Sequence, residues 1–456
     1  MTRLGRLFAV GGLALAGCTP VGAPMPTAPP PAPPRAEPTD VVAEPRPAPA
    51  GVPTEVPTEV PTEVPTARPV RSFREVRGLW VVRWTMTSPE QVREMVADAA
   101  DAGFNTLLVQ VRGRADAFYV SDLEPRAENL QGPLGFDPLA LAIEEGHRRG
   151  MAVHAWVNTH LVWGPTAPPR SPAHLVNSNP EWLAVPRVLA RELYDIAPRD
   201  PRFFAALSEY AAERQGTVEG VYTSPSHPDV SARVRAVWMD LLERYDLDGI
   251  HFDYIRFPSA DFDYSRGALQ RFRDWVTPRV TVDRLVELER AWATNPLAYT
   301  TALPDEWDEF RRMHITSLVA EIYREVKARR PELVVSAAVV ADPQTAYSIR
   351  FQDWEAWLAQ GILDIAVPMA YTPDNGRFQA LVRGARRAAG HRERVWAGIG
   401  AYMDTLGGTL DKIDLARVED AGGVVVFSYD WAVTDGRGDP ADPYLRRLGR
   451  ERFGSQ

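Results

Sequence analysis

The chain has 456 residues, of which 45% are apolar, so it can bury at least one large core and is long enough for two or three domains. Its 51 basic and 60 acidic residues give a net charge of −9, which argues against a nucleic-acid binder that relies on phosphate contacts. A single cysteine excludes an internal disulfide framework, and no apolar run reaches the roughly 20 residues that span a bilayer.

The first 18 residues form the first expected segment, a secretory signal. Arg3 and Arg6 precede a short apolar stretch, which small residues follow. The sequence Leu15-Ala16-Gly17-Cys18 resembles a bacterial lipobox, in which the cysteine is lipidated and becomes the mature N-terminus. Acyl chains on Cys18 would hold the protein to a membrane of the cell envelope without spanning it, and an outer-membrane location is allowed. The alternative is an ordinary signal peptide with a chance cysteine.

Residues 19–72 form the second expected segment, a disordered Pro-rich tether. Between Pro20 and Pro69 lie 17 of the chain's 41 prolines and no aromatic residue, and the motif Val-Pro-Thr-Glu recurs at Val52, Val56 and Val60. Such a composition buries too little apolar surface to offset the entropy of ordering, so the segment should stay extended and solvated. Low-complexity drift without a required length is the alternative to a functional tether.

Residues 73–456 form the third expected segment, in which short apolar runs alternate with helical patterns. Strands that are apolar throughout are typical of a parallel sheet covered on both faces. The runs predict strands at Gly78–Arg83, Asn105–Val111, Met151–Val157, Gly249–Tyr254, Leu333–Val339, Asp364–Ala370, Arg394–Gly400 and Gly423–Tyr429. Five helices are expected at Pro89 to Gly103, Pro138 to Gly150, Asp229 to Tyr245, Glu309–Arg329 and Trp354–Gln360.

Eight such units predict an α/β protein with a (β/α)8 TIM-barrel fold. A doubly wound open sheet is the competitor, but no Gly-rich phosphate loop follows the first strand. Two long connections, 158–230 and 256–303, follow the third and fourth strands on the side where barrels carry their active sites. Their aromatic residues are expected either to stack on sugar rings or to form satellite cores: Trp163, Trp182, Tyr194, Tyr264, Trp275 and Trp292.

The end of the fourth strand carries the main catalytic candidate, Asp253. Strand alternation directs His251 and Asp253 towards the barrel interior and Phe252 towards the helices. A carboxylate at the inner top of a strand is costly unless it is hydrogen-bonded or used, so Asp253 is predicted to be catalytic. The alternative is a structural partner of Arg83 or Arg256. Asp248, at the start of the strand, should pair or cap at the opposite end of the barrel.

Glycoside hydrolysis requires a second carboxyl group across the scissile bond. Asp342, which follows the fifth strand, is the candidate, with a helix cap before Pro343 as the other interpretation. Asp430 and Asp116 are alternatives, and no glutamate stands at a strand end as the usual acid.

The other polar residues at the strand ends suit a hydroxyl-rich ligand. His251 lies one layer deeper and is expected to be a hydrogen-bonded core residue rather than a proton carrier. The eight histidines are scattered and form no His-x-His pair at the end of the first strand, so no metal and no other cofactor is expected. The candidates for substrate binding are Arg83, Gln110, Arg112, Asn158, His251, Tyr254, Tyr371 and Asp430.

Seven short stretches resemble the bacterial glycosyl-hydrolase-like family ten, in the family's order. They are Val76 to Val81, Val109 to Arg112, Asp116 to Tyr119, Ala155 to Asn158, Asp248 to Pro258, Asp353-Trp354 with Trp357-Leu358, and Val367 to Tyr371. The resemblance implies a (β/α)8 barrel, frequently in an envelope lipoprotein, with glycoside hydrolase activity and with peptidoglycan glycan strands among the substrates.

The resemblance also implies that Asp253 is the catalytic carboxylate and that Arg83, Gln110, Asn158 and Tyr371 line the site. Some relatives have a second acidic residue where this chain has Tyr254, so the identity of the acid/base partner stays open.

These observations favour an enzyme, a lipid-tethered glycoside hydrolase of the cell envelope that acts on a polysaccharide by carboxylate catalysis. The runner-up is a non-catalytic glycan-binding lipoprotein on the same barrel, motivated by the missing glutamate. A third class, an amidase or esterase, lacks a suitable nucleophile or metal set.

Overall fold

The computed structural model describes residues 75–164, 167–214, 216–434 and 442–454. The expected signal, Cys18 and the tether lie outside the described residues, so the fold is that of the third expected segment.

Eight parallel strands close into a barrel in the order β1-β10-β9-β8-β7-β6-β3-β2. Because β1 pairs with both β2 and β10, the barrel prediction is confirmed and the open sheet is ruled out. Each strand overlaps its expected range: β1 (Val76–Val81), β2 (Thr106–Arg112), β3 (Ala152–Asn158), β6 (Gly249–Asp253), β7 (Val334–Val340), β8 (Ile365–Met369), β9 (Trp396–Gly400) and β10 (Gly423–Phe427).

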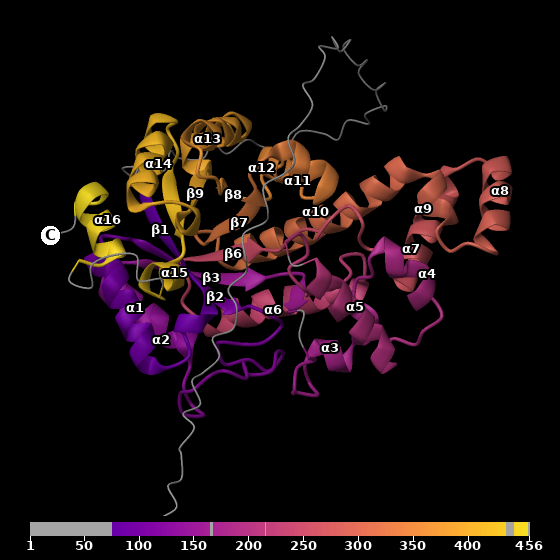
Figure 1. The fold of residues 1–456 in the computed structure, drawn as a ribbon, viewed down its shortest axis with the longest axis horizontal. Helices are drawn as coiled ribbons and strands as arrows, with labels where there is room; N and C mark the ends of the chain where they lie inside the picture. The colour runs from indigo at the N-terminus through magenta and orange to yellow at the C-terminus, as the bar shows by residue number, and fades with distance from the viewer. Residues whose placement is uncertain (1–74, 165–166, 215, 435–441, 455–456) are drawn as a thin grey trace, which may run out of the picture.

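Helices surround the barrel (Figure 1). The longer helices of this layer are α1 (Pro89–Asp101), α2 (Pro138–Arg148), α6 (Pro228–Arg244), α10 (Pro304–Arg329), α13 (Asn375–Ala389) and α14 (Leu406–Val418). Shorter helices are α11 (Pro343–Ile349), α12 (Trp354–Ala359), α15 (Tyr429–Thr434) and α16 (Tyr444–Arg452). α1 begins as the sequence indicates: Ser88 accepts a hydrogen bond from the Gln91 N–H, and Pro89 occupies the first turn.

The two long connections are largely ordered structure. The first contains the antiparallel pair β4 (Leu161–Trp163) and β5 (Val221–Tyr222), with α3 (Leu175–Ser178), α4 (Ala190–Leu193) and α5 (Pro201–Glu213) between them. The second contains α7 (Arg266–Val276), α8 (Val282–Trp292) and α9 (Ala298–Ala302). These three helices lie beyond the barrel, at the start of α10 (Figure 1).

The loop aromatics divide between the two expected roles. Tyr264 is buried in a separate cluster with Phe272, Trp307 and Phe310, and Tyr194, Trp275 and Trp292 pack against that cluster. Trp182 joins the main core. The satellite-core interpretation therefore holds for four of the six aromatics; Trp182 belongs to the main core, and Trp163 lines a cavity near the barrel mouth.

An aromatic layer fills the middle of the barrel, below the carboxyl ends of its strands. It contains Trp80, Trp156, Trp396 and aliphatic neighbours. His251 lies within this layer and is fully buried; its Nε2 accepts a hydrogen bond from the Trp80 indole N–H at 3.0 Å, and its Nδ1 lies 2.9 Å from the Ser336 hydroxyl. Burial lowers the pKa of His251 well below its usual value, so the ring is neutral at pH 7.

Asp248, at the start of β6, forms the pairing expected at the opposite end of the barrel. Asp248 accepts a hydrogen bond from the Val153 N–H and lies 2.8 Å from His147 Nε2, both at the N-terminal side of the barrel. Within the described ranges, no helix combines the length and apolarity needed to cross a membrane.

Candidate active site

Asp253 ends β6 and lies beside Asn158, its partner in the register of β3 and β6. Its Oδ1 accepts hydrogen bonds from the Tyr254 N–H at 2.6 Å and from Arg256 Nη1 at 3.0 Å. Among the residues that the structure describes, no group hydrogen-bonds Oδ2. The residue is 7% exposed, so the carboxyl group is held by one oxygen and nearly enclosed.

The protonation of Asp253 is set by two opposing effects. Burial raises its pKa above the ordinary value, and the positive charge of Arg256 and the Tyr254 N–H work in the opposite direction. The effect of burial is larger, so this carboxyl group holds its proton at higher pH than a solvated aspartate. A carboxyl group in this state can donate a proton to a leaving group.

Glu219 is an acidic residue whose charge acts on Asp253, and sequence reasoning missed it. It directly precedes the segment Gly220 to Tyr222, and its Oε2 accepts a hydrogen bond from the Tyr222 hydroxyl at 2.6 Å. The Tyr222 ring lies 6.0 Å from the Tyr254 ring. After burial and the effects of Arg256 and Tyr254, the negative charge of Glu219 is a further cause that raises the pKa of Asp253, so the two carboxyl groups share one electrostatic environment.

Only the pairing of β4 with β5 brings Glu219 to the site. A Cβ atom on Gly220 would lie 2.1 Å from the Trp163 carbonyl oxygen, so this close approach of two strands requires glycine. The glycine after Glu219 was the available signal in the sequence for a close approach of two strands. The sequence did not show which strand it approaches, because β4 lies more than fifty residues earlier.

A chain of amide and guanidinium groups crosses the ends of β1, β2 and β3. Arg83 Nη1 donates to Gln110 Oε1 at 2.7 Å, and Gln110 Nε2 donates to Asn158 Oδ1 at 3.2 Å. Asn158 Oδ1 also accepts from the Trp156 indole at 2.9 Å. The structure thus links Arg83, Gln110 and Asn158, and Asn158 lies beside Asp253; that these side chains bind substrate stays a prediction.

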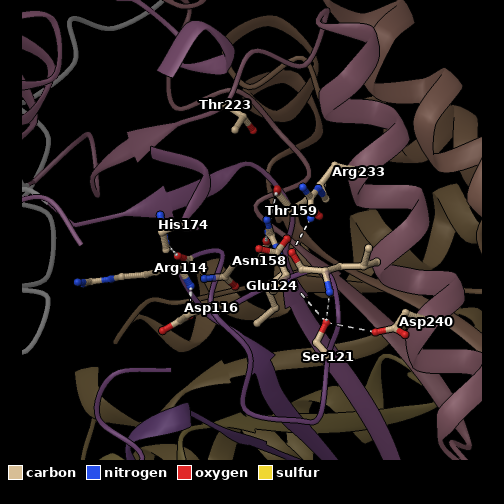
Figure 2. Close-up of polar contacts among 12 residues, drawn as sticks. Arg114, Asp116, Ser121, Glu124, Asn158, Thr159, His174, Thr223, Arg233 and Asp240 are labelled. Atoms are coloured by element: carbon tan, nitrogen blue, oxygen red, sulfur yellow. Dashed lines mark hydrogen bonds and ion pairs between the residues drawn. The ribbon is translucent and has the colours of Figure 1, made fainter. Parts of the chain in front are cut away.

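Arg112 has a structural place in this arrangement rather than a substrate-facing one. It is 1% exposed; its Nη1 donates to the carbonyl oxygens of Asn158 and Thr159 at 2.6 and 3.3 Å, and its Nε lies 3.2 Å from Glu124 Oε1. Figure 2 shows Glu124 beside Asn158 and Thr159, near Arg233 and Ser121. The prediction that Arg112 binds substrate is corrected, because its guanidinium is buried and bonded to Glu124 and to the carbonyl oxygens of Asn158 and Thr159.

His251 needs the same correction. Both ring nitrogens have protein partners, and the ring lies in the aromatic layer below the carboxyl group of Asp253. It supports the floor of the site and does not reach a ligand.

Two tyrosines complete the rim. Tyr254 has a left-handed backbone (φ +49°), and Arg256 lies over its ring at 4.3 Å. Tyr371, after β8, is partly exposed and packs edge-on against Trp80. Burial raises the pKa of both hydroxyl groups, so both are protonated donors at neutral pH.

The proposed second carboxyl group, Asp342, lies elsewhere. It is exposed and caps α11, where its Oδ1 accepts from the Thr345 N–H at 2.7 Å. This geometry favours the helix-cap interpretation. Asp430 is buried at the start of α15 and accepts from the Val82 N–H at 2.7 Å, so it fixes the end of β1.

A cavity of about 150 Å³ opens next to Arg83, the first residue of the hydrogen-bonded series Arg83–Gln110–Asn158. It is lined by Arg83, Trp84, Arg114, Asp116, Pro125, Arg126, Glu128, Asn129, Trp163, Ser171 and His174. Asp253 does not line this cavity. In the described part of the chain, no three His, Cys, Asp or Glu residues are grouped so that they could hold a metal ion.

A closed (β/α)8 barrel with acidic, amide and aromatic groups at the carboxyl ends of its strands defines the class of TIM-barrel proteins, which carry their active sites at that face. Residues 75–399 match the family described as glycosyl hydrolase-like 10, and the chain belongs to this family.

Two curated relatives agree with this assignment. Glycosyl hydrolase DigH of Escherichia coli strain K12 is 26% identical over 325 residues, 66% of this chain and 63% of that protein. Glycosyl hydrolase YngK of Bacillus subtilis is 23% identical over 334 residues, 66% of this chain and 55% of that protein. The matches thus span less than two thirds of the length of either relative.

The glycoside hydrolase domain of PgaB (BpsB) from Bordetella bronchiseptica shares the fold. Its TM-score is 0.55 at 14% identity, over 79% of this chain and 97% of that domain.

Proposed function

We propose that this protein is a glycoside hydrolase that cleaves a polysaccharide, with peptidoglycan glycan strands as the first substrate to test. The observation that carries the proposal is the buried carboxyl group of Asp253 at the end of β6, in the electrostatic range of a second carboxyl group, Glu219. Membership of the glycosyl hydrolase-like 10 family and the names of the two relatives support it.

In the proposed mechanism, Asp253 acts as the general acid. Its raised pKa keeps a proton available for the leaving glycosidic oxygen. Glu219 is the second carboxylate, which either activates water or attacks the sugar carbon directly, according to the separation of the two groups. Arg256 holds one oxygen of Asp253 and leaves the other oxygen for the substrate.

The expected pH profile follows from the role of Asp253. A general acid must be protonated, so kcat/KM should fall as pH rises through the pKa of Asp253. Because that pKa is raised, the fall should occur above the ordinary range of an aspartate.

Purified protein incubated with peptidoglycan, denuded glycan strands and common polysaccharides tests the proposal through new reducing ends. Asp253→Asn and Glu219→Gln should each lower kcat by about 10²–10⁴-fold, the usual contribution of an acid/base group. Asp342→Asn is the matched control and should retain turnover, because Asp342 caps an exposed helix.

Two outcomes contradict the assignment. Unchanged turnover in Asp253→Asn removes Asp253 from the chemistry. A loss in Asp342→Asn as large as in Asp253→Asn, with Glu219→Gln active, transfers the second role from Glu219 to Asp342.

A non-catalytic glycan-binding protein is the second candidate. The enclosure of Asp253, which is 7% exposed and does not line the cavity beside it, favours this candidate. Binding of a polysaccharide without any new reducing ends would select it.

We also propose that the protein is anchored in the cell envelope by lipid on Cys18. The support is the sequence alone, since Leu15-Ala16-Gly17-Cys18 has the order of a lipobox. An anchored barrel would act on polymer close to its membrane.

A further inference from the structure

The cavity beside the barrel mouth is separate from the carboxyl group of Asp253 and has its own chemistry. Its lining comes from the end of β1, the loop after β2 and the loop after β3. The strands β2 and β6 are both neighbours of β3, so their ends lie roughly 10 Å apart at the usual strand spacing. A ligand in this cavity would therefore be next to the proposed site of cleavage.

Two arginine side chains give the cavity cationic groups that are available to a ligand. Arg83 is 6% exposed, and burial lowers its pKa to about 10, which still leaves it charged at pH 7. Arg114 is half-buried, and burial lowers its pKa as well. Within the described ranges, the guanidinium of Arg114 has no hydrogen-bond or ion-pair partner, and its side chain extends away from the Asn158 and Glu124 cluster (Figure 2).

The charges that line the cavity sum to a positive value. Arg83, Arg114 and Arg126 face Asp116 and Glu128, which leaves one net positive charge. Glu128 is moreover bound by Arg170, whose Nε lies 2.7 Å from Glu128 Oε2. Burial lowers the pKa of His174, so its ring is neutral at pH 7. A positive site on a chain of net charge −9 suits a ligand with a single negative charge.

The other feature of the lining is aromatic. Trp84 is 44% exposed, and the Arg83 guanidinium lies over its ring at 4.0 Å. Trp163 is half-buried and packs edge-on against His174 at 5.0 Å. A partly exposed indole, that of Trp84, next to fixed cations matches a ring that has an apolar face and an anionic substituent.

We propose that this cavity is a subsite for a sugar that carries a free carboxylate, with Arg114 as the principal carboxylate ligand and Trp84 as the stacking surface. The proposal rests on the proposed action on glycans and adds a substrate class to it. A planar guanidinium without a protein partner offers the two parallel N–H groups that a carboxylate accepts. The carboxylate can belong to a uronic acid ring or to an acidic ether substituent on an amino sugar.

Calorimetric binding to the full-length Asp253→Asn variant tests the subsite, because the expected loss of turnover in that variant keeps cleavage of the probes slow during the titration. The two probes are denuded peptidoglycan strands, which have carboxylates on ether substituents, and oligogalacturonate, which has them on the ring. Each probe is compared with its own methylamide, in which a neutral amide replaces every carboxylate. At least one acidic probe should bind about tenfold more tightly than its amide, from a charge-assisted bidentate contact.

The added variant Arg114→Gln should bring that ratio close to one, and Arg114→Lys should preserve part of it. Arg290→Gln is the control, because Arg290 is exposed on α8, far from the barrel mouth, and its ratio should equal that of the parent. Retention of tight binding by Arg114→Lys also shows that the position tolerates substitution.

Equal binding of acid and amide for both probes, no binding of any probe, or a ratio that survives Arg114→Gln would overturn the subsite. A failure of the catalytic proposal gives a different result. In that case the wild-type protein produces no new reducing ends, but it still binds the acidic probe more tightly than the amide. Which probe shows the preference identifies the source of the carboxylate.

Discussion

Tyr254 shows how the backbone at a single residue shapes the site. Its φ of +49° lies in the left-handed region, which costs a non-glycine residue on the order of 1–3 kcal/mol. In this conformation its N–H donates to Asp253 Oδ1 at 2.6 Å, and its ring lies under Arg256. The unfavourable conformation therefore holds both the carboxyl group and its cationic partner.

Asp430 provides a prediction about stability at the residue scale. Burial raises its pKa to about 7 from the ordinary 3.8, against the opposing effect of the Val82 N–H. Between those two values the folded state keeps a proton that the unfolded state has lost. The contribution of Asp430 to stability is therefore complete below about pH 4 and is lost as pH rises through 7.

The variant Asp430→Asn stays neutral and can still accept from Val82. Between pH 5 and 7 the free energy of unfolding of the wild type should fall relative to this variant by on the order of 2 kcal/mol. Urea unfolding at a series of pH values measures the difference, and Asp195→Asn, at an exposed position, should follow the wild type. Parallel pH profiles for wild type and Asp430→Asn would contradict a protonated Asp430.

At the scale of elements, Arg112 at the end of β2 connects the loop after β2 to the end of β3. The side chains of Arg112 and Glu124 are each 2% exposed, and Arg112 also binds the carbonyl oxygens that follow β3. Breaking such a pair leaves an uncompensated buried charge, so Glu124 fixes Arg112, and Arg112 in turn holds the end of β3. These loops supply most of the lining of the proposed carboxylate subsite.

The β4–β5 pair makes a prediction about catalysis. In Gly220→Ala the new methyl group would lie 2.1 Å from the Trp163 carbonyl oxygen, so the pair must open. We expect a loss of about 1–3 kcal/mol in stability and a fall in kcat, because Glu219 is displaced from Asp253. Denaturant unfolding and reducing-end assays measure the two effects.

Gly384→Ala is the matched control for this substitution. Nothing lies within 4 Å of a Cβ at Gly384 in the interior of α13, so activity should be retained and stability should rise by about 0.5–1 kcal/mol. A fully active Gly220→Ala would argue against a catalytic role for Glu219.

At the scale of the whole molecule, the barrel body is preceded by residues 1–74, which lie outside the described ranges. The proposed anchor predicts that the wild-type protein sediments with membranes and incorporates a labelled fatty acid. Cys18→Ser should abolish the label and release the protein from the membrane fraction. If Cys18→Ser fractionates as the wild type does, the segment is an ordinary signal peptide or another membrane-binding element.

The fold itself follows from local patterns in the sequence. All eight barrel strands overlap their expected ranges, because a strand covered on both faces needs a continuous apolar run between turn residues. Strand alternation also placed His251 and Asp253 on the inner side, since the period of two is a property of the strand alone.

The partners of those residues depended on contacts between distant segments. Glu219 comes to the site through a strand pair that joins residues about sixty positions apart, and the same connection carries Trp163 to the carboxylate cavity. Arg112 and Asp342 have sequence contexts that fit a substrate-binding or catalytic residue, yet one is enclosed by carbonyl groups and the other caps an exposed helix. Sequence periodicity determined which side chains point inward; only the packing of the long connections decided which of them meet, because that packing depends on close approaches such as the one at Gly220.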